Sequence, residues 1–215
     1  MAAVTPQYTP KILEELSLSR TYGAAVAGLD EAGRGAWAGP VYAAAVVLPL
    51  QDADLLAILR DVRDSKLLSP AKRERLLPLI EDTSQAVGVG WARAAEIDSQ
   101  GIVPARQLAM RRALDSLGSD VDALLIDYLC LPQVDLPQRC LPKADMRCLS
   151  VAAASIVAKV SRDRIMVAMD EQLPGYDFAS HKGYGTQAHR AALAKLGPCP
   201  IHRISWRPFQ TMPGV

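Results

Sequence analysis

Hydrophobic residues along the chain fall into short unbroken runs and longer segments with helical spacing. Short apolar runs bounded by glycine, proline or acidic residues predict buried strands. Four such runs occur, at residues 24–30, 40–49, 85–92 and 122–127. The glycine-containing loop "EAGRGAWAG" joins the first two runs, and the fourth ends in Asp127. The pattern therefore predicts two consecutive strands, followed by strands that alternate with helices.

Helical spacing accounts for most of the remaining chain. Ser69 and Pro70 are a typical N-cap and first helical residue for a helix over 70–81, which Pro78 is expected to limit. Further helices are predicted over 104–118, 149–173 and 187–197, the last capped by Thr186, with a loop over 174–186. The small and apolar residues of 149–173 indicate one face packed closely on a sheet. The predicted class is α/β, a mixed sheet with helices packed on it.

Length and composition limit the functional classes. The 215 residues suffice for one domain with a single core, and no repeat or composition break marks a second. The net charge is +1, so any binding of a polyanion depends on local charge. Residues 143–215 hold ten Lys and Arg against five Asp and Glu, which favours the C-terminal third as that surface. No signal peptide or membrane-spanning run is recognised, which predicts a cytoplasmic protein.

The four cysteines argue against a structural zinc site. Cys130, Cys140, Cys148 and Cys199 form no CxxC motif and have no paired histidine spacing. We expect them to be buried or free thiols in a reducing compartment.

Acidic residues lie where buried strands end. Asp30 and Glu31 end the first predicted strand, Asp127 ends a later one, and Asp145 precedes the long helix. One such acid alone is most often a turn or cap residue. If the two strands are neighbours, however, the carboxylates converge, repel one another and need a cation. A carboxylate-only site suits Mg²⁺ or Mn²⁺, and two such ions about 3.5–4 Å apart can hydrolyse a phosphodiester.

The glycine loop has three interpretations. "GRGAWA" fits the dinucleotide fingerprint G-x-G-x-x-A, but a β-rich run rather than a helix follows it, so that reading fails on context. Alternatively, Gly33 and Gly35 let the backbone approach a ligand closely, while Arg34 offers donors to a phosphate. A plain turn is the third possibility.

Taken together, these segments resemble the type 2 ribonucleases H, specifically bacterial ribonuclease HII. The resemblance covers about residues 22–209 in order, through these stretches: "GLDEAGRGAWAGPVYAAAVVL", "DSKLLS", "ALLID", "KADMRCLSVAAASIVAKVSRDRIM", "HKGYGTQAH" and "GPCPIHRISWRPF". It departs from the family pattern at Trp37, Leu67 and Tyr128.

The resemblance implies a fold and an activity. The fold would be an RNase H-like mixed sheet flanked by helices, in one domain over 1–215, with an N-terminal segment over about 1–20 and a C-terminal helical extension over about 186–215. The activity would be Mg²⁺- or Mn²⁺-dependent hydrolysis of RNA in RNA–DNA hybrids and 5′ of single ribonucleotides in duplex DNA. The products would carry 3′-hydroxyl and 5′-phosphate ends.

The same resemblance assigns roles by position. The metal-binding catalytic acids would be Asp30, Glu31, Asp127 and Asp145. The substrate-binding loop that senses the ribose 2′-OH would be formed by Gly33, Arg34 and Gly35. Tyr184 would stack on the following deoxyribose, although a core tyrosine is an alternative. A protein tells RNA from DNA by the 2′-OH, which fits these roles.

Several expectations remain open at this point. Lys66 and Lys182 are candidate phosphate contacts, or solvated lysines. His181, His189 and His202 share no metal-ligand spacing and are expected in packing or phosphate-side positions. The partners expected are hybrid and ribonucleotide-containing duplexes, with no membrane and no obligate protein, for a monomer. The rivals are a different carboxylate-metal nuclease acting on DNA or structured RNA, and a catalytically silent hybrid binder.

Overall fold

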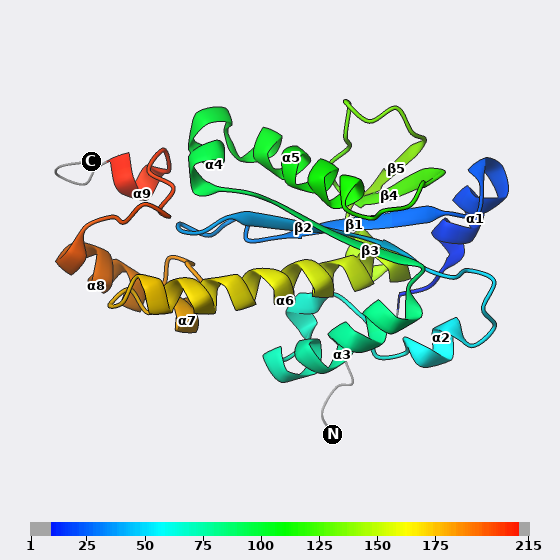
Figure 1. Cartoon of the computed structure of the whole chain (residues 1–215), viewed down its shortest axis with the longest axis horizontal. Coiled ribbons are helices and arrows are strands. Elements are labelled where there is room, and N and C mark those ends of the chain that lie inside the picture. The colour runs from blue at the N-terminus through cyan, green and yellow to red at the C-terminus, as the bar shows by residue number, and fades with distance from the viewer. Residues whose placement is uncertain (1–9, 211–215) are drawn as a thin grey trace, which may run out of the picture.

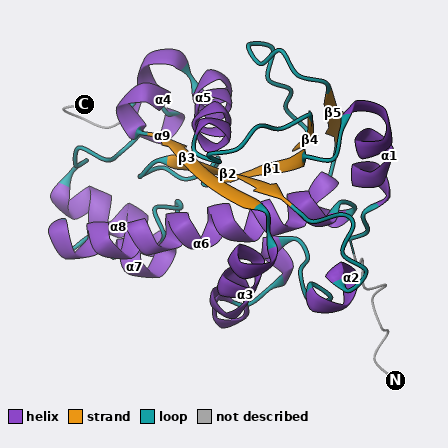
Figure 2. Cartoon of the chain, turned by 45° about the vertical axis from the view of Figure 1, so that its right-hand side comes forward, coloured by secondary structure: helices purple, strands orange, loops and turns teal. Residues whose placement is uncertain are grey.

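A mixed β-sheet lies between two layers of helices (Figures 1 and 2). The structure is a computed structural model and describes residues 10–210. The first nine residues of the expected N-terminal segment and the last five of the expected C-terminal extension therefore lie outside the described residues. Within the described range, no helix is both long and apolar enough to cross a membrane.

The sheet has the strand order β3-β2-β1-β4-β5. β2 pairs antiparallel with β1 and with β3, whereas β4 pairs parallel with β1 and with β5. This arrangement confirms the predicted mixed sheet. The strands are β1 (Val26–Ala32), β2 (Val41–Val47), β3 (Ala86–Ala92), β4 (Ala123–Asp127) and β5 (Gln138–Leu141).

Helices cover both faces of the sheet and continue beyond one end of it (Figure 1). The α-helices are α1 (Leu13–Tyr22), α2 (Leu55–Ile58), α3 (Pro70–Thr83), α4 (Ala94–Gln100), α5 (Ile102–Asp115), α6 (Leu149–Gln172), α7 (Phe178–His181), α8 (Gln187–Leu196) and α9 (Arg207–Gln210). Two short 3₁₀ helices, η1 (Ser65–Leu67) and η2 (Ala144–Met146), adjoin the sheet.

Strand alternation sends neighbouring residues to opposite faces, and each face has its own core. On one face Ala44 and Val46 of β2 pack with α3 and α6, while on the other Ala43 and Ala45 pack with α5. A third cluster, with Met166 among its members, joins the far end of α6 to α7, α8 and α9. This cluster fixes the C-terminal helical region to the end of α6.

Small residues let α6 lie close to β1. A Cβ atom at Gly28 would lie 2.4 Å from the carbonyl carbon and the Oγ atom of Ser150, on the first turn of α6. Ser150 is in turn held by the buried carboxylate of Glu15, which accepts from its N–H at 2.9 Å and its Oγ–H at 2.8 Å. The close approach places the start of α6 against the strand that carries Asp30.

The four predicted strands and the four predicted helices are all present, with some differences. α3 runs through Pro78 to Thr83, because Leu77 and Ile80 on either side are buried in the core. The expectation that Pro78 limits this helix is therefore wrong. The predicted loop over 174–186 contains the short helix α7.

The expectation of four free thiols is wrong for two of the cysteines. Cys130 and Cys140 form a disulfide, their Cα atoms 5.7 Å apart. The parallel pairing of β4 with β5 makes this possible, because it brings Cys140 beside Ile126 and so close to the loop that follows β4. Cys148 and Cys199 are free, as expected.

We predict that Gly28→Ala lowers the free energy of unfolding by about 1–3 kcal/mol, because the added methyl group overpacks the contact between β1 and α6. Urea unfolding followed by circular dichroism measures the change. Gly35→Ala is the matched control, since a Cβ there meets no atom within 4 Å and Gly35 does not have a positive φ. Equal stability of the Gly28→Ala protein and the unchanged protein would contradict the packing argument.

Candidate functional site

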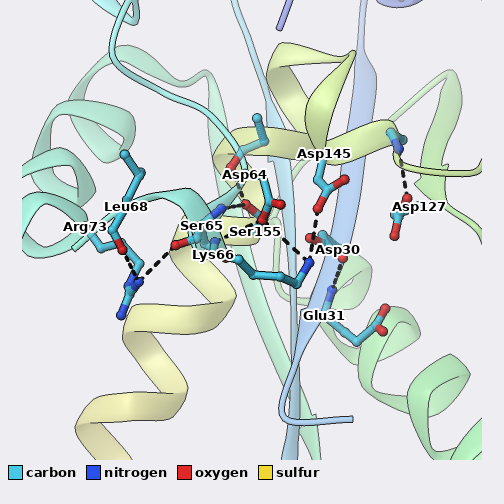
Figure 3. Close-up of polar contacts among 12 residues, drawn as sticks. Asp30, Glu31, Asp64, Ser65, Lys66, Leu68, Arg73, Asp127, Asp145 and Ser155 are labelled. Atoms are coloured by element: carbon cyan, nitrogen blue, oxygen red, sulfur yellow. Dashed lines mark hydrogen bonds and ion pairs between the residues drawn. The ribbon is translucent and has the colours of Figure 1, made fainter. Parts of the chain in front are cut away.

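Four acidic side chains gather where β1 and β4 end (Figure 3). The parallel register pairs Leu29 with Ile126, so Asp30 and Asp127 follow on adjacent strands. Asp145 is brought alongside by η2, whose Ala144 N–H donates to Asp127 Oδ1 at 2.8 Å. The convergence expected from the sequence is therefore present.

Asp30 and Glu31 point to opposite faces of the sheet, because they are consecutive in a strand. Asp30 lies on the α6 face, while Glu31 turns to the α5 face. There its Oε1 is 2.8 Å from Nη2 of Arg106, on α5. Both side chains of this ion pair are buried, and within residues 10–210 Glu31 Oε2 and Arg106 Nε have no hydrogen-bond partner.

Burial and the charges of their neighbours make Asp30, Asp127 and Asp145 hard to ionise. The pKa of Asp30 is raised well above its usual value, first by burial and then by the charges of Glu31, Asp127 and Asp145. Burial also raises the pKa of Asp127 and of Asp145. A site of this kind is electrostatically incomplete without positive charge.

Lys66 supplies part of that positive charge. Its Nζ lies 3.2 Å from Asp145 Oδ2 and 3.5 Å from Asp64 Oδ1, although 76% of its side chain is exposed. Burial lowers the pKa of Lys66, but the charges of Asp64, Asp145 and Asp30 outweigh burial and raise it. The structure thus brings Lys66 to the acids, together with Asp64, which the sequence analysis did not single out.

Hydrogen bonds to its backbone hold the segment that carries Lys66 in place (Figure 3). Arg73 donates to the carbonyl oxygens of Ser65, at 2.9 Å, and Leu68. The Ser65 N–H donates to Ser155 Oγ of α6 at 3.1 Å. The backbone of Lys66 is therefore held in place, and its largely exposed side chain extends from there to Asp145.

The donor set fits a hard divalent cation. Within residues 10–210, no three Asp, Glu, His or Cys side chains stand in a geometry that could hold a metal ion as they are. The reason is local, since Glu31 is turned to Arg106 and Asp145 to Lys66. Clustered carboxylates without histidine or thiolate suit Mg²⁺ or Mn²⁺. The unpartnered buried Oε2 of Glu31 is a donor that such an ion would satisfy.

Three of the four acids, Asp30, Glu31 and Asp127, line a cavity of about 290 Å³ that the glycine loop also lines. Larger hollows exist, such as one of about 650 Å³ beside Trp91 and Arg112, but they lie away from the four acids. The cavity at the acids is lined by Asp30, Glu31, Ala32, Gly33, Arg34, Gly35, Ser65, Lys66, Asp127, Lys159 and Tyr184.

Two buried arginines hold the glycine loop in shape. Arg203 donates to the carbonyl oxygens of Gly33 at 2.8 Å, Arg34 at 2.9 Å and Gly39 at 3.0 Å. Burial and the nearby Arg162 lower the pKa of Arg203 to about 9. Arg203 comes from the C-terminal region, so that region builds part of the site.

Arg162 of α6 ties the same loop to the segment before Tyr184. It donates to the carbonyl oxygens of Ala38 at 3.0 Å, Pro40 at 2.9 Å and Lys182 at 2.9 Å. Gly33, with φ of 88°, is required here, because a Cβ would lie 2.0 Å from Arg162 Nε.

Tyr184 faces the cavity between two cationic side chains. Lys159 Nζ lies 5.6 Å and the Arg162 guanidinium carbon 5.4 Å from the centre of its ring. Its ring is half-buried, unlike that of a core tyrosine. Lys182, in contrast, does not line this cavity, and its ammonium group donates to the Ala179 carbonyl oxygen.

The three histidines form a buried cluster behind the Tyr184 loop, in packing positions as expected. His189 Nδ1 bonds with the Tyr184 carbonyl oxygen at 3.1 Å, and its Nε2 with His202 Nε2 at 3.0 Å. His181 Nδ1 accepts from the Gly183 N–H at 3.1 Å. The cluster therefore fixes the backbone on both sides of the Tyr184 ring.

Some residues of the site left little signal in the sequence. Arg106 lies among apolar residues of a helix, and Arg162 and Arg203 carry no motif that marks them as loop anchors. The excess of positive charge after residue 142 was the available signal for Arg162 and Arg203. In the structure, however, these two arginines are buried within the molecule instead of forming its surface.

Comparisons with known proteins agree on one family. The family model for Ribonuclease HII matches residues 27–209. Ribonuclease HII of Roseiflexus castenholzii is 50% identical over 203 residues, which cover 94% of this chain and 91% of that protein. Ribonuclease HII of Chloroflexus aurantiacus is 52% identical over 202 residues, covering 93% and 94%. The crystal structure of ribonuclease H2 from Pyrococcus horikoshii superposes with a TM-score of 0.70 at 28% identity, covering 86% of this chain and 95% of that one.

We predict that the histidine cluster makes the fold less stable in mild acid. Burial lowers the pKa of His189 and of His202 to about 4, below the 6.5 of an unfolded histidine. The unfolded state therefore binds more protons between about pH 6.5 and pH 4, and stability falls as pH falls through this window. Urea unfolding at a series of pH values measures the slope.

Acidification also protonates the buried carboxylate of Asp30, which raises the stability of the fold. A variant without the histidines is therefore needed to isolate their contribution. The double variant His189→Asn with His202→Asn should show a shallower fall in stability than the unchanged protein. Equal slopes would mean that the two histidines do not stay neutral in the folded state.

Proposed function

Because the chain belongs to the ribonuclease HII family and is a ribonuclease H, we propose that it hydrolyses the RNA strand of RNA–DNA hybrids and cuts 5′ of single ribonucleotides in duplex DNA. The products carry 3′-hydroxyl and 5′-phosphate ends. The observation that carries the proposal is the cavity in which acidic side chains, the glycine loop and Tyr184 face one another.

The metal ligands in this proposal are Asp30, Glu31, Asp127 and Asp145, and the ion is Mg²⁺ or Mn²⁺. When bound, two such ions would activate a water molecule and neutralise charge on the scissile phosphate. The raised pKa of Asp30 supports the assignment, since positive charge is what this carboxyl lacks.

Lys66 and Arg34 supply mobile positive charge at the rim of the cavity. Lys66 is paired with Asp145, yet its side chain is 76% exposed, so it can leave the acid and contact a phosphate oxygen. Arg34 is exposed on the glycine loop. Such contacts position a duplex without reading its sequence. Lys182 is the weaker candidate, because its ammonium group donates a hydrogen bond to the Ala179 carbonyl oxygen.

Gly33, Arg34 and Gly35 sense the 2′-OH in this proposal. Arg203 engages the carbonyl oxygens of Gly33 and Arg34, so the backbone is preorganised before a substrate arrives. Within residues 10–210 the Gly35 N–H donates to no acceptor, and nothing would lie within 4 Å of a Cβ there. This backbone is therefore open to a ribose hydroxyl, the group that separates RNA from DNA.

The protein acts as a single domain and as a monomer in this proposal, without an obligate protein partner. Because the substrate in this proposal is chromosomal DNA, the protein works in the cytoplasm.

Cleavage of an end-labelled DNA duplex with one ribonucleotide tests the function. We expect a cut only 5′ of the ribonucleotide in Mg²⁺ or Mn²⁺, none with chelator and none in an all-DNA duplex. Cleavage of the all-DNA duplex would favour a nuclease of different specificity. Hybrid binding by folded protein, with no cut in either ion, would identify a silent binder.

Asp30→Asn should lower cleavage at least about 100-fold, because the variant loses a proposed metal ligand. Binding of the hybrid, measured by fluorescence anisotropy in chelator, should largely survive. Asp120→Asn is the control, since Asp120 is exposed in the loop before β4. Loss of hybrid binding with the fold intact would show that Asp30 is not primarily catalytic.

Tyr184→Ala should reduce cutting at a single ribonucleotide about tenfold or more, a loss in the range expected for one stacking contact. Tyr184→Phe keeps the ring and should stay within about threefold of the unchanged protein. Thermal unfolding of both variants separates this loss from a loss of stability. Normal cutting by Tyr184→Ala would remove the residue from the site.

A further inference from the structure

Arg106 is a buried cation within the acidic site. It is 4% exposed, on the face of α5 that packs against the sheet, between the fully buried Ala105 and Ala109. One NH2 nitrogen lies 2.8 Å from Glu31 Oε1. Its charge also reaches Asp127, where it partly offsets the rise in pKa caused by burial. Arg106 therefore acts on acids from both strands of the site.

The two cations of the site differ in mobility. The Lys66 side chain is 76% exposed and can leave its acid, whereas the Arg106 side chain is 5% exposed and surrounded by the core. The Arg106 guanidinium is therefore held in place beside the acids.

We infer that Arg106 is a positioning residue that holds Glu31 by Oε1 and stands in for a divalent cation at that carboxylate when the site is empty. Among the residues that the structure describes, Oε2 of Glu31 has no hydrogen-bond partner, and it is the oxygen that remains for an ion. This inference rests on the metal site proposed above.

A consequence follows for metal affinity. Arg106 stabilises the metal-free protein, because it partners a buried carboxylate that would otherwise be unpaired. An arriving ion meets a carboxylate that is already partly neutralised and is repelled by the fixed guanidinium. Removal of Arg106 therefore destabilises the metal-free site more than the loaded one, and the ion binds more tightly.

Calorimetric titration of Mn²⁺ into the full chain, without substrate, tests this inference. Arg106→Met should bind Mn²⁺ at least about tenfold more tightly than the unchanged protein, since one partner of a buried ion pair is removed. Its kcat at saturating Mn²⁺ should fall, because Glu31 is no longer oriented. Its melting temperature in chelator should also fall, and the rise on adding Mn²⁺ should be larger. A merely structural role would weaken metal binding and activity together.

The helix α5 offers a matched control. Arg112 also pairs with a glutamate at 2.8 Å, but Glu96 is remote from the four acids. Arg112→Met should leave the Mn²⁺ affinity unchanged. In the Glu31→Gln background, Arg106→Met should tighten binding less, because the carboxylate that Arg106 holds is gone and only the repulsion of the ion by the guanidinium remains. Arg106→Gln, which removes the charge but keeps a donor, should tighten binding in the same direction and replaces Arg106→Met if that variant does not fold.

Unchanged or weaker Mn²⁺ binding by folded Arg106→Met or Arg106→Gln would overturn the inference. Failure of the proposed metal site itself would be seen in other measurements. If the unchanged protein binds no Mn²⁺, or if Asp30→Asn binds it equally well, the proposed ligands are wrong.

Discussion

The repulsion among buried carboxylates at the ends of β1 and β4 is the constraint on which the rest of the site depends. Parallel pairing of these strands fixes Asp30 and Asp127 side by side, and η2 adds Asp145. Because burial and neighbouring charges raise the pKa of Asp30, ionised acids are tolerated there only with positive charge nearby. The surrounding elements each bring a means of supplying it.

Those elements divide the work between fixed and mobile groups. Arg106 of α5 is buried against Glu31. Lys66 of η1, in contrast, lies on a backbone segment held by hydrogen bonds and pairs with Asp145 through a largely exposed side chain. Away from the acids, Arg162 and Arg203 donate to carbonyl oxygens of the glycine loop and its neighbours. Buried arginines thus have two roles in this protein: Arg106 neutralises an acid, whereas Arg162 and Arg203 hold backbone carbonyl groups in position.

The sequence was sufficient for the elements that carry the acids. Asp30, Glu31 and Asp127 stand out because short unbroken apolar runs end at or next to them. Arg106 could not be found in this way, since a charged residue on a helix is ordinarily expected on its exposed face. Beside Arg106, the buried face of α5 consists of Ala105, Ala109, Met110 and Ala113.

Long-range contacts account for the other differences. The bond between Cys130 and Cys140 depends on the pairing of β4 with β5, and β5 itself has no alternating apolar pattern. The Arg203 anchor joins segments about 170 residues apart in the chain. Neither the spacing of cysteines nor the charge of a C-terminal segment determines such partners.

An anomalous difference map from crystals of the full chain soaked in Mn²⁺ tests whether the acids bind a metal ion. We expect manganese peaks within about 2.0–2.2 Å of carboxylate oxygens of Asp30 and its acidic neighbours at the ends of β1 and β4. A soaked crystal with no peak at these acids, or with ordered manganese only elsewhere on the molecule, would contradict it.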